Sequence, residues 1–304
     1  MKRLLILPLA LCAAVLVQAA YATAPAQDNP EETEGPGEVV TILHESGSKA
    51  REGRIHRGRR AGLWRAWYEN GNLQYVGEYR DYQRVGRWRT YREDGTKESE
   101  VAYLDGKPDG DFKGWHPSGE LALTGTYDEG SREGEWRHFM PTGVLWRKVT
   151  YQGGLRNGPT WIGNTEGEPL EEGQLSHGLR IGDWVRYHPT GHKASSGSYA
   201  NGREQGEWRF YDEDGELDGE GPFVAGQQHG RWVGYHPNGN KRFVGWFSRG
   251  KQEGDWVLYW QNGQKKAEGQ CRGGHWEGQW ECWKRDGTPD PTKSGLYALG
   301  ELQR

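Results

Sequence analysis

The chain is poor in sulphur and in apolar surface. It has only three cysteines and two methionines among 304 residues, and its mean hydropathy is −1.00. So polar a composition would ordinarily indicate disorder, because too little apolar surface can be buried to offset the entropy lost on folding. The formal net charge is only −4, which argues against a nucleic acid as the partner.

Motifs that would carry chemistry are lacking too. The sequence has no Gly-x-Ser-x-Gly elbow, no His-Glu-x-x-His and no phosphate-binding loop that ends in Gly-Lys-Ser/Thr. His116, His188 and His236 share one repeat position, but copies two repeats apart should lie about 19 Å from each other, too far to share a metal ion. Each is followed by proline, which fits a turn. We therefore expect no metal, no cofactor and no enzymatic activity.

Glycine, in contrast, is abundant and periodic. With Gly62 as position 1, a glycine starts every 24-residue unit without an insertion or deletion. A fixed period identifies a repeat protein, in which each unit buries its apolar surface against its neighbours. The starting glycines are Gly62, Gly86, Gly110, Gly134, Gly158, Gly182, Gly206, Gly230, Gly254 and Gly278.

Aromatic residues occupy three fixed positions of this unit. Position 6 is aromatic in every copy except at Gly163, and position 18 is usually tyrosine or phenylalanine. Position 3 is tryptophan except at Phe112 and Thr160. Each ring buries roughly 150–250 Å², which offsets the polar composition. The expected core tryptophans are Trp64, Trp88, Trp136, Trp184, Trp208, Trp232, Trp256 and Trp280.

Each unit predicts one β-hairpin. Asn70-Gly71, Asp94-Gly95 and Asn238-Gly239 follow the position-6 aromatic, and such pairs readily adopt the positive φ of a tight hairpin turn. A further glycine at position 21 turns the chain toward the next unit, and so much glycine disfavours helix throughout. We expect an all-β fold, an elongated single antiparallel sheet of stacked 24-residue hairpins.

The pattern divides the chain into four segments. Residues 1–22 combine a basic start, an apolar run and small residues, as in a secretory signal peptide, and Leu11 before Cys12 does not fit lipoprotein cleavage. Residues 23–37 indicate a flexible Pro/Glu-rich linker. Residues 38–288 form the array, with a degenerate first repeat at 38–61, and 289–304 a C-terminal tail. The signal predicts export to the periplasm or the extracellular space, with no transmembrane span after its removal.

Two cysteines remain after the predicted signal, Cys271 and Cys282. They should lie on neighbouring strands, so in an oxidising compartment a disulfide could staple the C-terminal end of the array. Alternatively, both are small apolar residues at packing positions. The sequence does not decide between the two, because it does not fix the Cα separation.

The fifth of the ten units counted from Gly62, residues 158–181, departs from the pattern. Thr160, Gly163 and Leu175 replace its three aromatics, while its glycines stay in place and Trp161 lies one position out of register. Either this unit has drifted within a tolerant array, or it forms a bend or cleft at which a partner docks.

Other aromatics fall where the repeat does not require them. Aromatics are common anchors of binding surfaces, although these could instead cover the exposed end of the stack. The candidate partner-binding residues are Trp146, Trp161, Trp246, Trp260 and Trp276.

A basic stretch marks the degenerate first repeat and the start of the second. It runs from Lys49 to Arg65 with only Glu52 against it. It could make a weak contact with anionic lipid, or it could simply be a solvated surface.

The unit Gly-x-Trp-x-x-Tyr, x-Asn-Gly, Gly-x-Tyr, x-x-Gly resembles the MORN-repeat variant of bacterial proteins grouped with the YwqK-type antitoxin family. The resemblance extends over residues 38 to about 288. It implies an elongated, curved antiparallel sheet of successive hairpins. It also implies attachment to a protein or a membrane lipid, and it brings no catalytic residues.

These observations favour a non-enzymatic exported scaffold that binds a protein, a glycan or an envelope surface. One alternative is an antitoxin or immunity protein that neutralises a partner toxin by direct binding, which the family label implies. The other is an envelope hydrolase, which would need carboxylates or histidines that converge near the fifth repeat.

Overall fold

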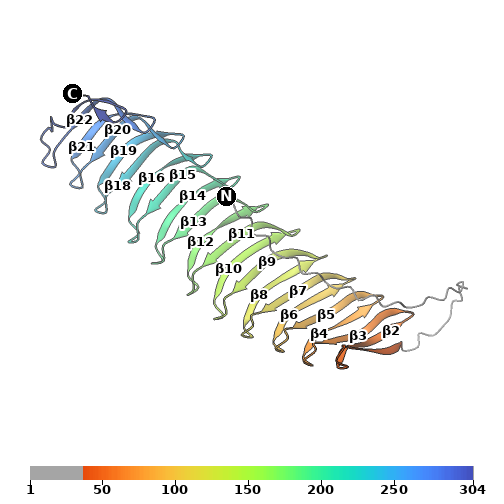
Figure 1. Cartoon of the computed structure of the whole chain (residues 1–304). Helices are drawn as coiled ribbons and strands as arrows, with labels where there is room; N and C mark the ends of the chain where they lie inside the picture. Colours follow the sequence, from red (N-terminus) through yellow and green to blue (C-terminus); the bar gives the residue numbers. More distant parts are fainter. Residues whose placement is uncertain (1–36, 304) are drawn as a thin grey trace, which may run out of the picture. The chain divides into compact units, whose positions relative to one another are not determined.

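Residues 37–303, the part of the chain that the computed structural model describes, form one open antiparallel sheet (Figure 1). Consecutive strands pair with each other, except that the short strands at 227–228 and 230–235 lie end to end along the same partner, so the order along the sheet follows the order in the sequence. No helix occurs among these residues, and hence none of a length and hydrophobicity that would span a membrane. The expected fold class is confirmed. The predicted signal peptide and residues 23–36 of the predicted linker lie outside the described residues.

Each repeat supplies two strands. The first half of the sheet consists of β1 (Glu38–Leu43), β2 (Lys49–His56), β3 (Arg59–Trp67), β4 (Leu73–Arg80), β5 (Gln83–Tyr91), β6 (Lys97–Leu104), β7 (Lys107–Trp115), β8 (Leu121–Asp128), β9 (Ser131–Phe139), β10 (Leu145–Gln152), β11 (Leu155–Gly163) and β12 (Pro169–Ser176). The second half consists of β13 (Leu179–Tyr187), β14 (Lys193–Ala200), β15 (Arg203–Tyr211), β16 (Leu217–Val224), β17 (Gln227–Gln228), β18 (Gly230–Tyr235), β19 (Lys241–Ser248), β20 (Lys251–Tyr259), β21 (Lys265–Arg272), β22 (His275–Cys282), β23 (Gly295–Ala298) and β24 (Glu301–Leu302).

The core is a row of tryptophan rings, each lying flat on a glycine of the preceding strand. A Cβ atom built on Gly77 would lie 2.2 Å from the Trp88 ring, so this contact requires glycine. The glycine costs about 0.5–1 kcal/mol in backbone entropy, whereas burying the ring stabilises by about 4–6 kcal/mol. The free energy gained by burying the tryptophan ring therefore outweighs the entropic cost of glycine at the facing position. The same contact joins Gly53 to Trp64, Gly125 to Trp136, Gly173 to Trp184, Gly197 to Trp208, Gly221 to Trp232, Gly245 to Trp256 and Gly269 to Trp280.

The indole nitrogen fixes the ring in this place. Trp88 Nε1 donates to the Glu78 carbonyl at 3.1 Å, the residue directly after the covered glycine. Trp64, Trp184, Trp208, Trp232, Trp256 and Trp280 donate to the equivalent carbonyl. Trp136 differs, since its buried Nε1 has no partner among the described residues. The eight expected core tryptophans are each at most 4% exposed.

Two repeats replace both members of the pair. Val101 stands in place of the glycine and faces Phe112 across the strand pair, and Val149 likewise faces Thr160. At both sites, valine replaces the glycine on the first strand, and a side chain smaller than tryptophan replaces the tryptophan on the next strand. The residues at these two positions therefore change together, as a steric contact requires.

Arginine and tyrosine cover the tryptophan rings. The Arg180 guanidinium lies 4.3 Å from the Trp184 ring centroid and 5.2 Å from that of Tyr199. Its Nη1 also donates to the Tyr199 hydroxyl at 3.2 Å. Arg60, Arg84 and Arg132 repeat this arrangement at position 23 of their units.

The hairpin tips are tied from one repeat to the next. His116 Nε2 bonds the Phe139 carbonyl at 2.8 Å, and His188 Nε2 bonds the Tyr211 carbonyl at 2.9 Å. His236 makes the same bond to Tyr259. These histidines therefore link adjacent turns.

The sheet continues past residue 288, where loss of the 24-residue phase predicts the end of the array. β22 pairs with β23 so that Trp280 faces Gly295 and Gly278 faces Tyr297. These pairings are those of positions 3 with 16 and 1 with 18 in the other repeats. The loop before β23 is two residues longer than the period allows, which hides this last half-repeat in the sequence.

Cys271 and Cys282 are both free and buried. Cys271 faces Trp276 whereas Cys282 faces Ala267, so the two lie four residues apart along the strand direction, about 13 Å. A disulfide needs Cα atoms closer than about 7 Å. The disulfide considered for this pair is therefore not formed, and both cysteines pack as small apolar residues.

The glycine–tryptophan contact can be tested by a double-mutant cycle. Gly77→Val should lower the free energy of unfolding by about 1–3 kcal/mol or more, because its Cβ overlaps the Trp88 ring. Trp88→Phe added to it should recover part of this loss, with a coupling energy of about 1–3 kcal/mol. Urea unfolding measures both. The control pairs Gly77→Val with the distant Trp208→Phe, and their effects should simply add. A cycle at Gly77 and Trp88 as additive as this control would refute the steric match.

The cysteines should resist alkylation in the folded protein. Burial, with the nearby Glu253 carboxylate, raises the pKa of the Cys271 thiol to about 11, so at pH 8 only about 0.1% is thiolate. Burial also raises the pKa of Cys282. Iodoacetamide followed by peptide mass spectrometry should find both unlabelled until the protein is denatured. Rapid labelling of the native protein, or a Cys271–Cys282 peptide pair, would contradict this packing.

Candidate functional site

The two faces of the sheet differ. The face with the position-3 tryptophans, here called the aromatic face, also holds the covering arginines and tyrosines. The opposite face, here called the ladder face, has one central row in which each residue faces the next across the strands. From β9 to β20 this row runs Arg137, Lys148, Trp161, Glu172, Val185, Ser196, Arg209, Glu220, Val233, Val244 and Val257.

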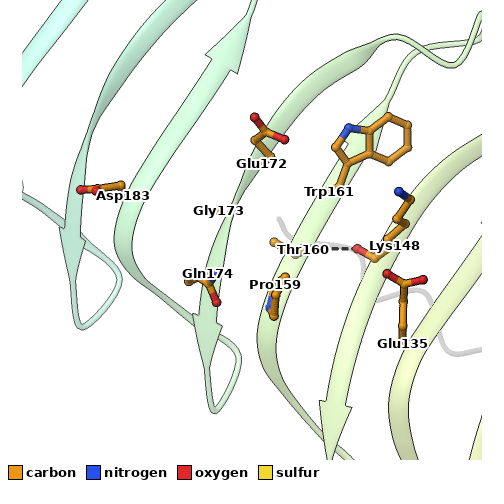
Figure 2. Close-up of a pocket in the computed structure, with 9 residues that line it drawn as sticks. All are labelled: Glu135, Lys148, Pro159, Thr160, Trp161, Glu172, Gly173, Gln174 and Asp183. Atoms are coloured by element: carbon orange, nitrogen blue, oxygen red, sulfur yellow. Dashed lines mark hydrogen bonds between the residues drawn. The ribbon is translucent and has the colours of Figure 1, made fainter.

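The fifth repeat hollows the ladder face. A pocket of about 560 Å³ extends from β9 to β13 (Figure 2). Lys148, Trp161 and Glu172 are three consecutive members of the central row. Pro159 lies two residues before Trp161 on β11, below it in the view of Figure 2. The pocket is completed by Glu135, Thr160, Gly173, Gln174 and Asp183.

Gly163 explains why the hollow lies here. A Cβ atom on Gly163 would lie 2.3 Å from the Trp161 ring, so the missing position-6 aromatic lets Trp161 lean along its own strand, away from Pro159. Figure 2 shows the ring directed away from Pro159 and Gln174. Short Pro159 then leaves open space where most repeats carry a longer side chain at position 2. The substitutions in the fifth unit thus act together to open the pocket.

Carboxylates dominate the charge of the pocket. Glu135, Glu172 and Asp183 stand against the single ammonium of Lys148, whose Nζ lies 5.4 Å from the Trp161 ring centroid. Glu172 accepts a hydrogen bond of 2.8 Å from the Tyr187 hydroxyl. Burial, together with this carboxylate, raises the pKa of Tyr187 to about 12. The tyrosine thus stays a neutral donor that orients Glu172 in the pocket wall.

The remaining two carboxylates are also held in place. Asp183 accepts from the Ser198 hydroxyl at 2.5 Å, and Glu135 accepts from Arg137 Nε at 2.7 Å. Each carboxylate keeps free lone pairs that can accept further hydrogen bonds. The pocket therefore presents oriented acceptors beside an indole ring.

Groups that could together hold a metal ion do not gather in residues 37–303. No three metal-ligating side chains converge there. At the hairpin tips, hydrogen bonds from Thr96 and Thr288 lower the pKa of Asp94 and Asp286, which keeps these carboxylates ionised near neutral pH.

Trp246 is the most exposed of the candidate tryptophans, at 49%. It lies on β19 two residues after Val244, at the ladder face. Val233, Val244 and Val257 face one another across β18 to β20. An apolar patch therefore adjoins Trp246 toward the C-terminal end of the ladder face.

The other candidate tryptophans have structural contacts. Trp276 stacks on Trp280 with centroids 3.7 Å apart and 3° between the planes, in the position that arginine takes over Trp184. Trp260 Nε1 donates to the Trp283 carbonyl at 3.1 Å, as the turn histidines do. Trp146 packs edge-on against His138. Trp246, Trp260 and Trp276 thus do not form one patch.

The basic stretch is divided by the fold. Arg60 lies on Trp64 and Tyr79 at the aromatic face, and Lys49 pairs with Glu52. Contact of this stretch with lipid stays a prediction.

Sequence reasoning singled out Trp161 and the fifth unit but missed the carboxylates around them. Glu135, Glu172 and Asp183 come from three different strands. The repeat register could have identified them. Glu135 and Asp183 are at position 2 of their units and Glu172 is at position 15, and both positions lie on the same face as Trp161. Pro159 at position 2 was the local sign of a hollow.

Comparisons with known proteins identify the repeat. Residues 60–81, 108–129, 132–152 and 204–225 match the family model described as MORN repeat variant. No curated protein matches the chain.

Similar solved structures align at low sequence identity. The Photorhabdus luminescens Tc holotoxin pore aligns at 12% identity over 88% of this chain and 16% of that chain, with a TM-score of 0.18. The TcdB2–TccC3 crystal structure aligns at 11% identity over 81% of this chain and 14% of that chain, with a TM-score of 0.16. This chain therefore spans about a sixth of the length of these proteins. Four of the units are thus copies of the MORN repeat variant, within an array whose other units share the same 24-residue spacing.

Proposed function

We propose that the protein is a non-enzymatic, exported binding scaffold that holds its partner on the ladder face. The partner is a protein, a glycan or another component of the envelope surface. The observation that carries this proposal is the pocket at Trp161, which lies where the repeat pattern is broken. A break that only reflected drift would be expected to leave a loose core, yet Val149 is fully buried and Thr160 is 7% exposed.

The two faces of the sheet differ in which side chains are free to bind a partner, and this difference supports the same proposal. On the aromatic face, rings and guanidinium groups are engaged in packing from one repeat to the next. The ladder face has the pocket and the exposed Trp246 free for a partner. Aromatic side chains beside polar groups are the usual anchors of such contacts.

The charges that line the pocket restrict the class of ligand that it can bind. The lining has three carboxylates and one ammonium, and although Arg137 pairs with Glu135 the site stays net negative, which disfavours an anionic group. Lys148 already lies near the Trp161 ring, so a second cation there would meet like charge. An uncharged ligand rich in hydroxyl groups, such as a glycan, satisfies both constraints through the oriented carboxylates.

Removing the indole should remove binding. The immobilised protein is incubated with the native envelope fraction, either untreated, protease-treated or periodate-oxidised, and the captured material is quantified. Trp161→Ala should lower capture at least about tenfold, and periodate should abolish it while protease does not. Leu104→Ala, an exposed residue on β6, is the matched control and should capture as wild type does. Equal capture by Trp161→Ala, or no capture by wild type, would refute the proposal that the partner binds in this pocket.

Filling the hollow should have the same effect as removing the ring. Gly163→Tyr restores the position-6 aromatic, and its Cβ would displace Trp161 toward the open space above Pro159. We expect at least about a tenfold loss of capture with the melting temperature preserved or raised. Trp246→Ala distinguishes the two surfaces, because it leaves this pocket intact. Full capture by Gly163→Tyr would show that the pocket is not where the partner binds.

A further inference from the structure

The two ends of the sheet are finished differently. At the C-terminal end Trp276 stacks on Trp280, and Tyr297 of β23 packs against Trp276 at 5.0 Å. The short strands β23 and β24 close this end. At the other end, β1 pairs with β2 on one side, and no other described strand pairs with it.

β1 has the composition of an inner strand. Its run Val39-Val40-Thr41-Ile42-Leu43 places apolar side chains on both faces instead of alternating apolar with polar. Val39 is 59% exposed, Ile42 44% and Leu43 56%. Proteins usually protect an edge strand with charge, proline or a bulge, since an apolar edge is a template for another strand. β1 has no charged residue and no proline between Val39 and Leu43, and its register shift between Ile42 and Leu43 lies on the side paired with β2, where Ala50 is the extra residue.

The open edge of β1 is defined by its hydrogen bonds. The His44 N–H donates to the Ser48 carbonyl at 2.8 Å, toward β2. Because successive backbone groups alternate in direction along a strand, Ile42 and Val40 also face β2. The N–H and C=O groups of Val39, Thr41 and Leu43 therefore point to the open edge.

We infer that β1 pairs with β1 of a second copy of this chain, antiparallel about a two-fold axis at Thr41. In this register Thr41 faces its own copy, Val39 faces Leu43 and Val40 faces Ile42. Every apolar side chain of the strand then meets an apolar side chain on the same face. The outward groups of Val39, Thr41 and Leu43 form six hydrogen bonds, two for each facing pair.

Charge permits this pairing. Glu38 would face His44 of the second copy. Arg51 and Arg54 lie on β2, three strands from β2 of the second copy, and so about 14 Å from their counterparts. This separation exceeds the screening length of about 8 Å at physiological salt. Self-complementarity about one axis is the hallmark of a two-fold homodimer.

The chain's own segment 23–36 fits the edge less well. It contains Pro25, Pro30 and Pro36 and lacks valine, isoleucine and aromatic residues. Proline cannot donate to a strand ladder. One strand from each subunit is a small contact, so we expect a dissociation constant that is roughly micromolar or weaker.

Sedimentation equilibrium over a range of concentrations tests the pairing. Wild type should pass from monomer to dimer as concentration rises. Thr41→Pro removes an outward N–H and should weaken association at least about tenfold, whereas Thr41→Ala keeps that N–H and should dimerise as wild type does. Circular dichroism and the melting temperature confirm that both variants fold. A wild type that stays monomeric, or a Thr41→Pro variant that still dimerises, would overturn the inference.

A cross-linking experiment fixes the register without relying on loss of function. Facing residues have Cα atoms about 5.5 Å apart, within reach of a disulfide. Thr41→Cys should therefore form a covalent dimer on mild oxidation. Ile42→Cys is the matched control, since its counterpart lies about 8 Å away in this register, and it should cross-link far less. Equal cross-linking of both variants, or none for Thr41→Cys, would exclude this two-fold pairing.

Discussion

The contact of an indole ring with the Cα of a glycine on the preceding strand is the constraint on which the whole sheet depends. A single-layered sheet has no second layer to bury its side chains, so its core must come from rings that lie flat on the backbone. The ring covers the glycine, and its N–H is bonded by the next carbonyl, as Trp88 shows on Gly77 and Glu78. Because each contact spans two repeats, the units are stable only as an array.

This constraint explains how much the sequence could reveal. The period, the hairpins and the core tryptophans follow from residue spacing alone, because packing between repeats demands the same residue at the same place each time. The last half-repeat was hidden because two extra residues shift Gly295 out of phase, although it packs as its predecessors do. The pocket could be predicted only in part, because residue spacing shows where the repeat pattern is broken but not which side chains come together there.

The same logic separates packing from recognition. Position 23 varies between units, with arginine in several and tryptophan in one, and Trp276 stacks on Trp280 where Arg180 stacks on Trp184. A tryptophan that looks out of place in the sequence can therefore be a substitute for another packing group. Trp161 is different, because it lies on the opposite face from the core and depends on Gly163 for its place. The face on which a residue lies is thus more informative than its departure from a consensus.

The paired exchange at Val101 with Phe112 and at Val149 with Thr160 limits how such an array can grow or shrink during evolution. Loss of residues 198–221 would place Gly197 before Trp232, a compatible junction. Loss of residues 102–125 would instead place Val101 before Trp136, and two bulky groups would compete for one space. Duplication and deletion can therefore succeed in the uniform second half, whereas units 86–109 and 110–133 must be inherited together, as must units 134–157 and 158–181.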